Sequence, residues 1–418
     1  MTRAGVAVGI DVGTSGVRAA LVDAAREPVA WGSAPLPPEQ RREPEAWWRA
    51  VAASLDGLRG AADLSGVRGV AVDGTSGTVL AVDAEGRCLA GASMYNDQAD
   101  PGAVQAVAAV AAADSAARGA TSPLARLLAW RGLRGLHRIL HQADWVMGRL
   151  CGRFDAGDAN NALKTGYDPR LGAWPDWLRG LGVSQDVLPR VFAPGTPVGR
   201  ITPAMAARLA LPGDAMVIAG TTDGCAAFLA TGAAQAGDAV TSLGSTLTVK
   251  LLCDAPVSAP RFGIYSHLIG GRWLAGGASN SGGAALLRYF EATALARLSE
   301  GIDPTRDSGL DYYPLPALGE RFPFADPAMV SRDTPRPLDD RQFLHGLLEG
   351  VARIEALGYR RLAELGAPAL GSVRSVGGGA GNAAWTAMRG RILNAPMLPA
   401  RSEAAAVGVA GLALAAVR

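Results

Sequence analysis

The sequence predicts an α/β fold with two domains, and three observations lead to this prediction. The chain has 418 residues, more than one ordinary hydrophobic core holds, so two domains are expected. Short β-type runs, such as residues 67–72, alternate with helical patterns, such as residues 45–59, and this alternation is typical of an α/β architecture. A hairpin pattern also occurs twice, at the start of the chain and just past its midpoint.

The first hairpin covers residues 6–22. An apolar run over 6–10 leads into the polar tip Asp11-Val12-Gly13-Thr14-Ser15-Gly16, and a second apolar run over 17–22 follows. The glycines at the tip are typical of a tight turn between two strands. A helix is predicted over 45–59. The next strand is predicted over 67–72 and ends on Asp73-Gly74-Thr75-Ser76-Gly77, after which extended structure resumes over 78–82.

The middle of the chain contains the second hairpin. Residues 100–152 are rich in Ala, Leu and Arg and are expected to be helical. A strand over 216–219 runs into Gly220-Thr221-Thr222-Asp223-Gly224, where a helix should begin with Thr222 or Asp223 as its cap. The second hairpin covers 238–252, with Leu243-Gly244-Ser245-Thr246 at its turn. Its similarity to the first hairpin indicates two related halves that divide near Ala230.

The second half is expected to contain one long loop and two helices. Residues 314–337 are rich in proline and predict a loop. Residues 343–365 have the apolar spacing of a long amphipathic helix. The Ala-rich segment 404–417 is too short to span a membrane, so it predicts a packed helix.

Composition and charge exclude several functions. A net charge of +2, with 19% charged residues, suits a globular protein and gives no basic excess that would attract nucleic acid. The four cysteines have no C-x-x-C spacing, so neither a zinc site nor a disulfide framework is predicted. The apolar run near the N-terminus is too short for a signal peptide. We therefore expect a cytoplasmic protein without nucleic-acid or membrane partners.

Four clusters of glycine and polar residues follow predicted β-runs. They lie at residues 11–16, at 73–77, at 220–224 together with 244–246, and at 377–382. Glycine lets a backbone approach a ligand closely and exposes successive N–H groups, while Ser and Thr add hydroxyl donors. Any one cluster could be an ordinary turn, but four together favour binding of phosphate and sugar oxygens. The chain has neither a P-loop motif nor a convincing dinucleotide-binding G-x-G-x-x-G unit.

These clusters resemble the motifs of one family. Gly9-Ile10-Asp11-Val12-Gly13-Thr14-Ser15 resembles the first phosphate motif of actin-like sugar kinases. Residues 220–224, 237–238 and 242–246 resemble the second phosphate region of the FGGY carbohydrate kinases, and residues 376–382, Trp385 and 403–413 resemble that family's adenosine motif and closing helix. The resemblance implies two actin-like (ribonuclease H-like) domains with an interdomain cleft. A sugar-binding domain would cover 1–230, completed by a C-terminal helix over 404–418, and a nucleotide-binding domain would cover 231–403.

The resemblance also implies ATP, Mg²⁺ and named roles. Asp223 would be the general base that accepts the proton of the sugar hydroxyl, although a helix N-cap is an alternative role for it. Asp11 would hold Mg²⁺ through water and contact the sugar. The groups expected to bind ATP share small or hydroxyl-bearing side chains in glycine-rich turns: Thr14, Ser15, Gly244, Ser245 and Thr246 at the phosphates, and Gly378, Gly379 and Asn382 at the adenosine.

The expected sugar contacts, besides Asp11 and Asp223, are Asp73, Ser76, Tyr95 and Asn96, although an ordinary polar turn would use the same residue types. Many family members carry Trp-x-Asp-x-Arg in the second region, whereas here Ala99 stands in place of the arginine.

Residues 73–78 and 309–323 resemble the short D-ribulose kinases, which implies phosphorylation of D-ribulose to D-ribulose 5-phosphate. D-xylulose, another sugar or polyol, and an ATPase of the same fold without sugar kinase activity remain alternatives. A homodimer also remains open.

Overall fold

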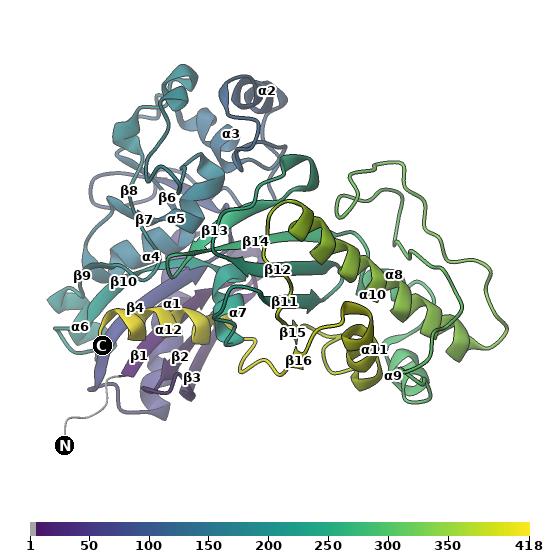
Figure 1. Cartoon of the computed structure of the whole chain (residues 1–418). Helices are drawn as coiled ribbons and strands as arrows, with labels where there is room; N and C mark the ends of the chain where they lie inside the picture. The colour runs from purple at the N-terminus through teal and green to yellow at the C-terminus, as the bar shows by residue number, and fades with distance from the viewer. Residues whose placement is uncertain (1–5) are drawn as a thin grey trace. The chain divides into compact units, whose positions relative to one another are not determined.

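The computed structural model describes residues 6–418 (Figure 1). The chain divides into two compact units. The first contains the chain up to Ala230, the short segment His267–Gly271 and the segment Ala404–Arg418; the second contains Thr231–Ser266 and Arg272–Glu403. Each unit contains most or all of one six-stranded mixed sheet. The prediction of an α/β fold with two sheet-containing domains is therefore confirmed.

The sheet of the first unit has the strand order β3-β2-β1-β4-β10-β9. Strands β1 (Val6–Val12), β2 (Gly16–Val22) and β3 (Pro28–Pro35) form an antiparallel meander. Strand β4 (Val67–Gly74) pairs in parallel with β1, and β10 (Met216–Thr222) pairs in parallel with β4. Strand β9 (Pro197–Arg200) is antiparallel to β10 at the edge. The carboxyl ends of β1, β4 and β10 therefore meet at one end of the sheet.

The sheet of the second unit repeats this arrangement, with the order β13-β14-β12-β11-β15-β16. Strands β11 (Asp238–Leu243) and β12 (Leu247–Cys253) form a hairpin, and β14 (Arg272–Ser279) lies antiparallel to β12. On the other side of the hairpin, β15 (Ser372–Val376) is parallel to β11, and β16 (Met397–Leu398) is parallel to β15. Strand β13 (Tyr265–Ile269) lies at the far edge. Five strands therefore follow the same order in the two sheets, with β9 and β13 added at opposite edges.

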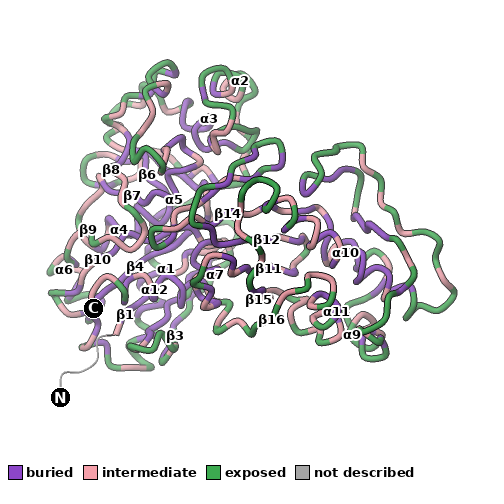
Figure 2. Tube along the Cα trace, viewed as in Figure 1, coloured by how far each residue is buried: buried purple, intermediate pink, exposed green. Residues whose placement is uncertain are grey.

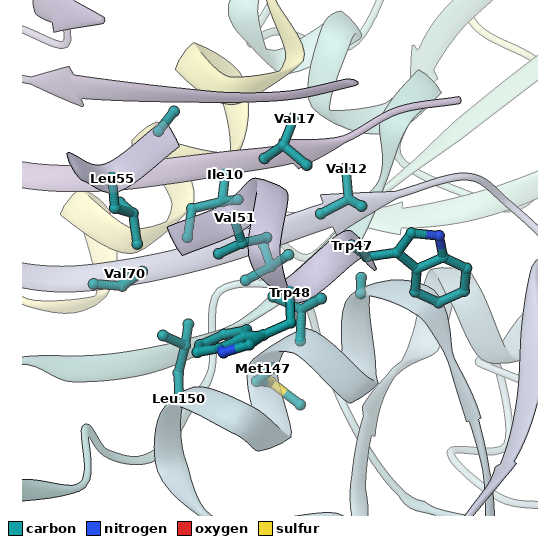
Figure 3. Close-up of a cluster of buried hydrophobic side chains, with 14 of the residues drawn as sticks. Ile10, Val12, Val17, Trp47, Trp48, Val51, Leu55, Val70, Met147 and Leu150 are labelled. Atoms are coloured by element: carbon teal, nitrogen blue, oxygen red, sulfur yellow. The ribbon is translucent and has the colours of Figure 1, made fainter. Parts of the chain in front are cut away.

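Helix α1 (Pro44–Ala61) covers one face of the first sheet, as its apolar spacing predicts. Figure 3 shows Trp48, Val51 and Leu55 of this helix together with strand residues such as Ile10 and with Met147 of α4 (Gln142–Cys151). Burying a side chain of this size contributes about 1.5–3 kcal/mol. This layer keeps the strand ends of the first unit in fixed positions.

The opposite face is covered by α12 (Ala405–Ala416), which confirms the predicted packed helix. This helix approaches both β1 and α7 (Asp223–Ala230) closely because glycines stand at the contacts. A Cβ atom on Gly9 would lie 1.9 Å from the carbonyl oxygen of Ala406, and one on Gly408 would lie 1.8 Å from that of Ala226. Backbone therefore packs directly on backbone.

In the second unit, the predicted long helix is α10 (Asp340–Glu364), and its side chains Leu347, Leu348, Val351 and Ile354 are buried as expected. Between α9 (Ala292–Ser299) and α10 the chain forms neither helix nor strand over 314–337, which confirms the predicted loop.

Two details of the predicted elements are wrong. Residues 100–152 are not helical throughout: α2 (Pro101–Val110) and α3 (Pro123–Leu127) are separated by an irregular segment. Residues Arg138–His141 form β6, because they pair antiparallel with β5 (Val79–Val82), a long-range interaction that composition does not reveal. In addition, β10 continues to Thr222 rather than stopping at residue 219, because it pairs with β4 as far as Gly74.

Figure 2 shows that the buried residues follow the strands and the helices that cover them. Within residues 6–418, no helix combines the length and the apolarity that crossing a bilayer requires. The remaining elements are β7 (Ala156–Asp158), β8 (Arg190–Phe192), α5 (Ala159–Ala162), α6 (Pro203–Leu209), α8 (Gly283–Leu286), α11 (Ala383–Leu393) and the short 3-10 helices Pro38–Gln40, Leu128–Trp130, Leu163–Thr165, Asp176–Leu181, Gln185–Val187 and Pro260–Phe262.

Candidate active site

Three aspartates stand at the carboxyl ends of three adjacent parallel strands of the first unit. Asp11 lies on β1 directly opposite Asp73 on β4, and Asp73 in turn lies opposite Thr221 on β10. Asp223 is the first residue of α7, immediately after β10. In open α/β sheets, ligands bind beyond the carboxyl ends of the strands. The structure therefore brings the predicted base and two predicted sugar-binding carboxylates to one binding edge.

Asp73 has an environment that favours its protonated form. Its side chain is 0% exposed, and neither carboxylate oxygen has a hydrogen-bond partner among the described residues. Burial raises the pKa of Asp73 well above its ordinary value, and the charges of Asp11 and Asp223 raise it further. Complete burial and the two neighbouring charges therefore favour the protonated form of Asp73.

Asp11 is less enclosed. Burial raises the pKa of Asp11, whereas the adjacent carboxyl group of Asp73 lowers it. The guanidinium of Arg18 stands across the hairpin, 3.9 Å from a carboxylate oxygen of Asp11, and also favours the ionised form. Of the two neighbours, Asp11 is therefore the better carrier of negative charge.

We expect the substitution Asp73→Asn to stabilise the ligand-free protein at neutral pH. Because the folded-state pKa of Asp73 is raised, ionising this group costs stability as the pH climbs above the ordinary value of 3.8. An amide of nearly the same shape has no such proton to lose. Urea unfolding of both proteins should give a stability difference that is small near the ordinary pKa of 3.8 and grows as the pH rises above it. A difference that is constant with pH would contradict this account.

Thr14 and Ser15 form the turn between β1 and β2, next to Asp11. The turn is closed by a hydrogen bond from the Gly13 amide to the Gly16 carbonyl, 3.0 Å, and it is tied down by the Leu36 amide, which donates to the Ser15 carbonyl at 3.0 Å. Ser15 is exposed and Thr14 is half-buried. Both residues can therefore present hydroxyl groups to a ligand at this edge.

The loop after β4 contains a second polar atom without a partner. The hydroxyl oxygen of Ser76 is buried and has no hydrogen-bond partner among the described residues. Its neighbour Thr75 is held in place, since its amide and its hydroxyl both donate to the side-chain oxygen of Gln142, at 3.0 and 2.9 Å. A buried polar group gains free energy when a ligand supplies the missing hydrogen bond.

Tyr95 and Asn96 lie next to this loop and are exposed. The Tyr95 amide donates to the hydroxyl of Thr78 at 3.2 Å, which joins the two predicted sugar-binding loops. Asp97 points elsewhere: it forms a two-point ion pair with Arg42, with nitrogen–oxygen distances of 2.7 and 2.6 Å. In the structure, Tyr95 and Asn96 are therefore exposed next to the loop after β4, where a ligand can contact them, whereas the Asp97 carboxylate is paired with Arg42.

Supporting residues of the first unit could not be found from the sequence. Asn160 donates to the hydroxyl of Thr221 at 2.8 Å and so holds the end of β10, two residues before Asp223. Arg126 is buried and donates to the carbonyl of Gly77 and to the loop that carries Tyr95. Both residues act through contacts with residues more than thirty positions away. No local motif signals such contacts.

A buried His141–Asp144 pair resembles part of a hydrolase site but lies away from solvent. The Nδ1 atom of His141 lies 2.8 Å from Asp144, and its Nε2 atom lies 2.8 Å from the hydroxyl of Thr165. All three side chains belong to residues that are 1% exposed. Burial also raises the pKa of the adjacent Asp158 to about 7. Because a substrate cannot reach these groups, we assign them a structural role.

In the second unit, Gly244, Ser245 and Thr246 form the turn between β11 and β12. The backbone of the segment after β14 supports this turn, since the Gly283 amide donates to the Gly244 carbonyl at 2.8 Å and the Ala284 amide donates to the Ser245 carbonyl at 3.0 Å. Ser245 is exposed. The turn therefore presents donors on a fixed backbone, as the turn at Thr14 and Ser15 does in the first unit.

The glycine loop after β15 packs against this turn. The Gly379 amide donates to the carbonyl of Leu243 at 3.0 Å, and a Cβ atom on Gly379 would lie 2.6 Å from the ring of Trp385. Gly377 has a φ angle of +85°, which favours glycine. Gly378 is exposed, and a Cβ atom added there would meet nothing within 4 Å. The second unit thus brings its two predicted nucleotide motifs together.

Asn382 acts as the N-cap of α11. Its side-chain oxygen accepts from the Trp385 amide at 2.9 Å, and its side-chain nitrogen donates to the hydroxyl of Ser299 at 2.8 Å. Residues 377–382 therefore form a glycine turn that precedes a helix N-terminus, an arrangement that also occurs in helices that bind no ligand. Such a terminus can also face an anionic or polar ligand, because its first N–H groups are free of helical partners.

Among residues 6–418, no group of three or more His, Cys, Asp or Glu side chains is arranged to hold a metal ion. A cavity of about 900 Å³ lies beside the loop that contains Asp97, with walls that include Arg42, Arg126 and Arg131. Its lining contains none of Asp11, Asp73 and Asp223. The three aspartates therefore do not line this cavity.

Comparison with known proteins agrees with this geometry. Residues 239–417 match the model of the FGGY family of carbohydrate kinases, C-terminal domain. The chain is 28% identical over 346 residues to a xylulose kinase of Klebsiella pneumoniae, which covers 77% of this chain and 71% of that one. It is 26% identical over 409 residues to a xylulose kinase of Escherichia coli K12, which covers 91% and 83%.

A solved structure gives the same result for the fold. The xylulose kinase of Rhodospirillum rubrum aligns with a TM-score of 0.83 at 24% identity, covering 98% of this chain and 89% of that one. The fold is thus that of the actin-like sugar kinases. The predicted resemblance to the FGGY family of carbohydrate kinases is therefore confirmed, over residues 239–417 by the family model and over most of the chain by the two xylulose kinases.

Proposed function

We propose that this kinase transfers the γ-phosphate of ATP to the terminal hydroxyl of a ketopentose, with Asp223 as the general base. The observation that carries the proposal is the meeting of Asp11, Asp73 and Asp223 at the ends of adjacent parallel strands. A polyol needs several acceptors in one place, and phosphoryl transfer needs one of them to accept the proton of the attacking hydroxyl. Asp223, half-buried at the start of α7, is the residue that we assign to that role.

The neighbouring groups fit a sugar. Asp73 and Ser76 are buried polar groups without protein partners, so hydroxyl groups of a ligand can satisfy them. A protonated Asp73 can donate to a sugar oxygen, while the ionised Asp11 beside it can accept from a sugar hydroxyl. Tyr95 and Asn96 border the same loop and supply an aromatic face and an amide.

The two glycine-rich turns are proposed to bind the phosphates of ATP. In the first unit, Thr14 and Ser15 offer hydroxyl groups on a closed turn, and in the second unit the backbone of Gly244–Thr246 does the same. Gly378 leaves open backbone against which a nucleotide can lie, Gly379 packs the loop against Trp385, and Asn382 stands at the adjacent helix N-terminus. These contacts bind and orient ATP.

Asp11 is the residue that would hold Mg²⁺. Its carboxylate is the oxygen donor that this hard ion prefers, its side chain is 13% exposed, and Mg²⁺ usually keeps several water ligands beside one or two carboxylates. When bound, the ion neutralises charge on the phosphates during transfer. Asp73 keeps its proton beside Asp11 and so leaves one carboxylate free for this contact.

Two ketopentoses are proposed as substrates. The strand end Asp73-Gly74-Thr75-Ser76 and the segment 309–323 favour D-ribulose, which would give D-ribulose 5-phosphate. The curated relatives at 26–28% identity are xylulose kinases, which favours D-xylulose. Ala99, in place of the arginine found in many relatives, removes one charged group from the second loop and thereby alters which sugar hydroxyl groups are recognised.

A substrate panel tests the proposal. Purified protein is incubated with Mg²⁺-ATP and each of D-ribulose, D-xylulose, L-ribulose, glycerol and gluconate, and ADP release is followed by a coupled assay. We expect one of the two D-ketopentoses to give the highest kcat/KM, with the phosphate position fixed by ³¹P and ¹³C NMR. ATP hydrolysis that no sugar stimulates would instead support an ATPase of the same fold and would overturn the proposal.

A further inference from the structure

We propose that Arg126 is a positioning residue for sugar binding, because its buried guanidinium joins the two loops that carry the proposed sugar contacts. One guanidinium nitrogen donates to the hydroxyl of Ser93 and to the carbonyl of Met94, both at 2.5 Å. The other donates to the carbonyl of Gly77 at 2.5 Å. Met94 directly precedes Tyr95, and Gly77 directly follows Ser76. This inference rests on the proposed function.

The planar geometry of the guanidinium matters for this role. Its two terminal nitrogens point in fixed directions, so they set the separation between the carbonyls of Gly77 and Met94. Gly77 has a φ angle of +100°, so the turn that presents its carbonyl depends on glycine. The same two segments are also joined by the hydrogen bond from the Tyr95 amide to Thr78 and by two backbone hydrogen bonds of 2.9 Å that Val79 and Ser93 exchange, whereas Arg126 contacts both loops through one rigid group.

The guanidinium of Arg126 donates its hydrogen bonds to neutral groups, whereas a buried arginine more often pairs with a carboxylate. The residue is 7% exposed, and its hydrogen-bond partners are two carbonyls and one hydroxyl. Burial lowers the pKa of Arg126 to about 10, so it stays charged at neutral pH. Asp97, the acidic group that interacts with it, is itself paired with Arg42. The buried guanidinium therefore fixes the carbonyls of Gly77 and Met94 in place, which suits two loops that must hold a sugar at set positions.

The position of Arg126 separates this role from direct contact with the reacting atoms. Arg126 lies near the end of α3, a short helix that starts after the cap Ser122, and it lines the cavity whose walls contain none of Asp11, Asp73 and Asp223. Its side chain holds the loops through the carbonyls of Gly77 and Met94 and the hydroxyl of Ser93. We therefore expect it to affect sugar affinity and to leave the nucleotide site unchanged.

Steady-state kinetics of Arg126→Lys with D-ribulose and D-xylulose test the proposal. Lysine keeps the charge but cannot hold two carbonyls at a fixed separation. With whichever ketopentose the wild-type enzyme uses best, we expect the KM for sugar to rise about tenfold, while the KM for ATP and kcat stay within about twofold. Arg126→Met, which removes all three hydrogen bonds, should raise the sugar KM further.

Arg131→Met serves as the matched control. Arg131 lines the same cavity but donates to the carbonyls of Leu128 and Leu181, away from the two loops. This variant should keep the wild-type KM for sugar. Thermal unfolding of all variants, together with calorimetric titration of sugar without ATP, shows whether any loss comes from unfolded protein, since unfolding lowers the apparent activity toward both substrates equally.

The outcomes distinguish the inference from the function on which it rests. A wild-type enzyme that phosphorylates a ketopentose and an Arg126→Lys variant with an unchanged sugar KM would overturn the inference alone. Equal rises in the KM for sugar and for ATP would also overturn it, since they indicate a general structural role. A wild-type enzyme that phosphorylates neither ketopentose would overturn the proposed function, whatever the variant does.

Discussion

The substitution Asp223→Asn is expected to lower sugar phosphorylation by about 10²–10⁴-fold while the protein stays folded. An amide has nearly the shape of the carboxylate but cannot accept the proton of the sugar hydroxyl. Its oxygen can still accept from the Gly224 amide, as the Asp223 carboxylate does at 2.6 Å. Removing this negative charge also lessens its repulsion with Asp73 and Asp11. The coupled assay measures turnover, and a fluorescent nucleotide measures ATP binding, which should be unchanged.

Asp214→Asn is the control for this substitution. Asp214 lies shortly before β10 and forms an exposed ion pair with Arg68, at 3.0 Å, which contributes little to stability. This variant should keep full activity. Near-normal turnover in Asp223→Asn would remove the assigned base and leave helix-start packing as the role of Asp223.

The substitution Gly408→Ala is expected to destabilise the first unit by about 3 kcal/mol or more. The added methyl group would stand 1.8 Å from the carbonyl oxygen of Ala226, so α12 and α7 would have to move apart. The strand core that both helices cover would then lose its close contact. Urea unfolding monitored by circular dichroism measures the loss, and loss of soluble expression is the extreme form of the same result.

Gly411→Ala on the same helix is the matched comparison. A methyl group there would meet only the flexible side chain of Arg26, at 3.8 Å. Because alanine favours a helix over glycine by up to about 1 kcal/mol, this variant should be as stable as the wild type or more stable. If both glycine variants unfold at the same urea concentration, the close helix contact does not limit stability.

Much of the fold can be predicted because its signals are local. The turns at Gly13–Gly16 and Leu243–Thr246, the apolar spacing of α1 and α10, and the small residues of α12 each stand out in a short window of sequence. Helix α1 (Pro44–Ala61) and α10 (Asp340–Glu364) lie within a few residues of their predicted bounds. The exception, β6, forms only because β5 pairs with it across more than fifty residues.

The candidate site can be predicted only in part, for the same reason. Asp11, Asp73 and Asp223 are visible because each ends a strand in a glycine-rich turn. The sequence does not show that the buried Asp73 carboxyl group has no hydrogen-bond partner among the described residues. Nor does it show that Asn160 holds the end of β10 and that Arg126 holds the loop at Gly77. Those properties arise when distant segments meet, and they decide the protonation of the site and the separation of its loops.

The placement of α12 has a consequence for biosynthesis. This helix covers a face of the first sheet, yet the ribosome makes it only after all of β11–β16 has been synthesised. During synthesis, the face of the first sheet that α12 later covers therefore stays exposed until residues 238–416 have been made. In the strands this face carries mainly alanine and other aliphatic side chains. Because these side chains are small, the face exposes little apolar area before α12 is made, and we expect it to contribute little to aggregation with other chains.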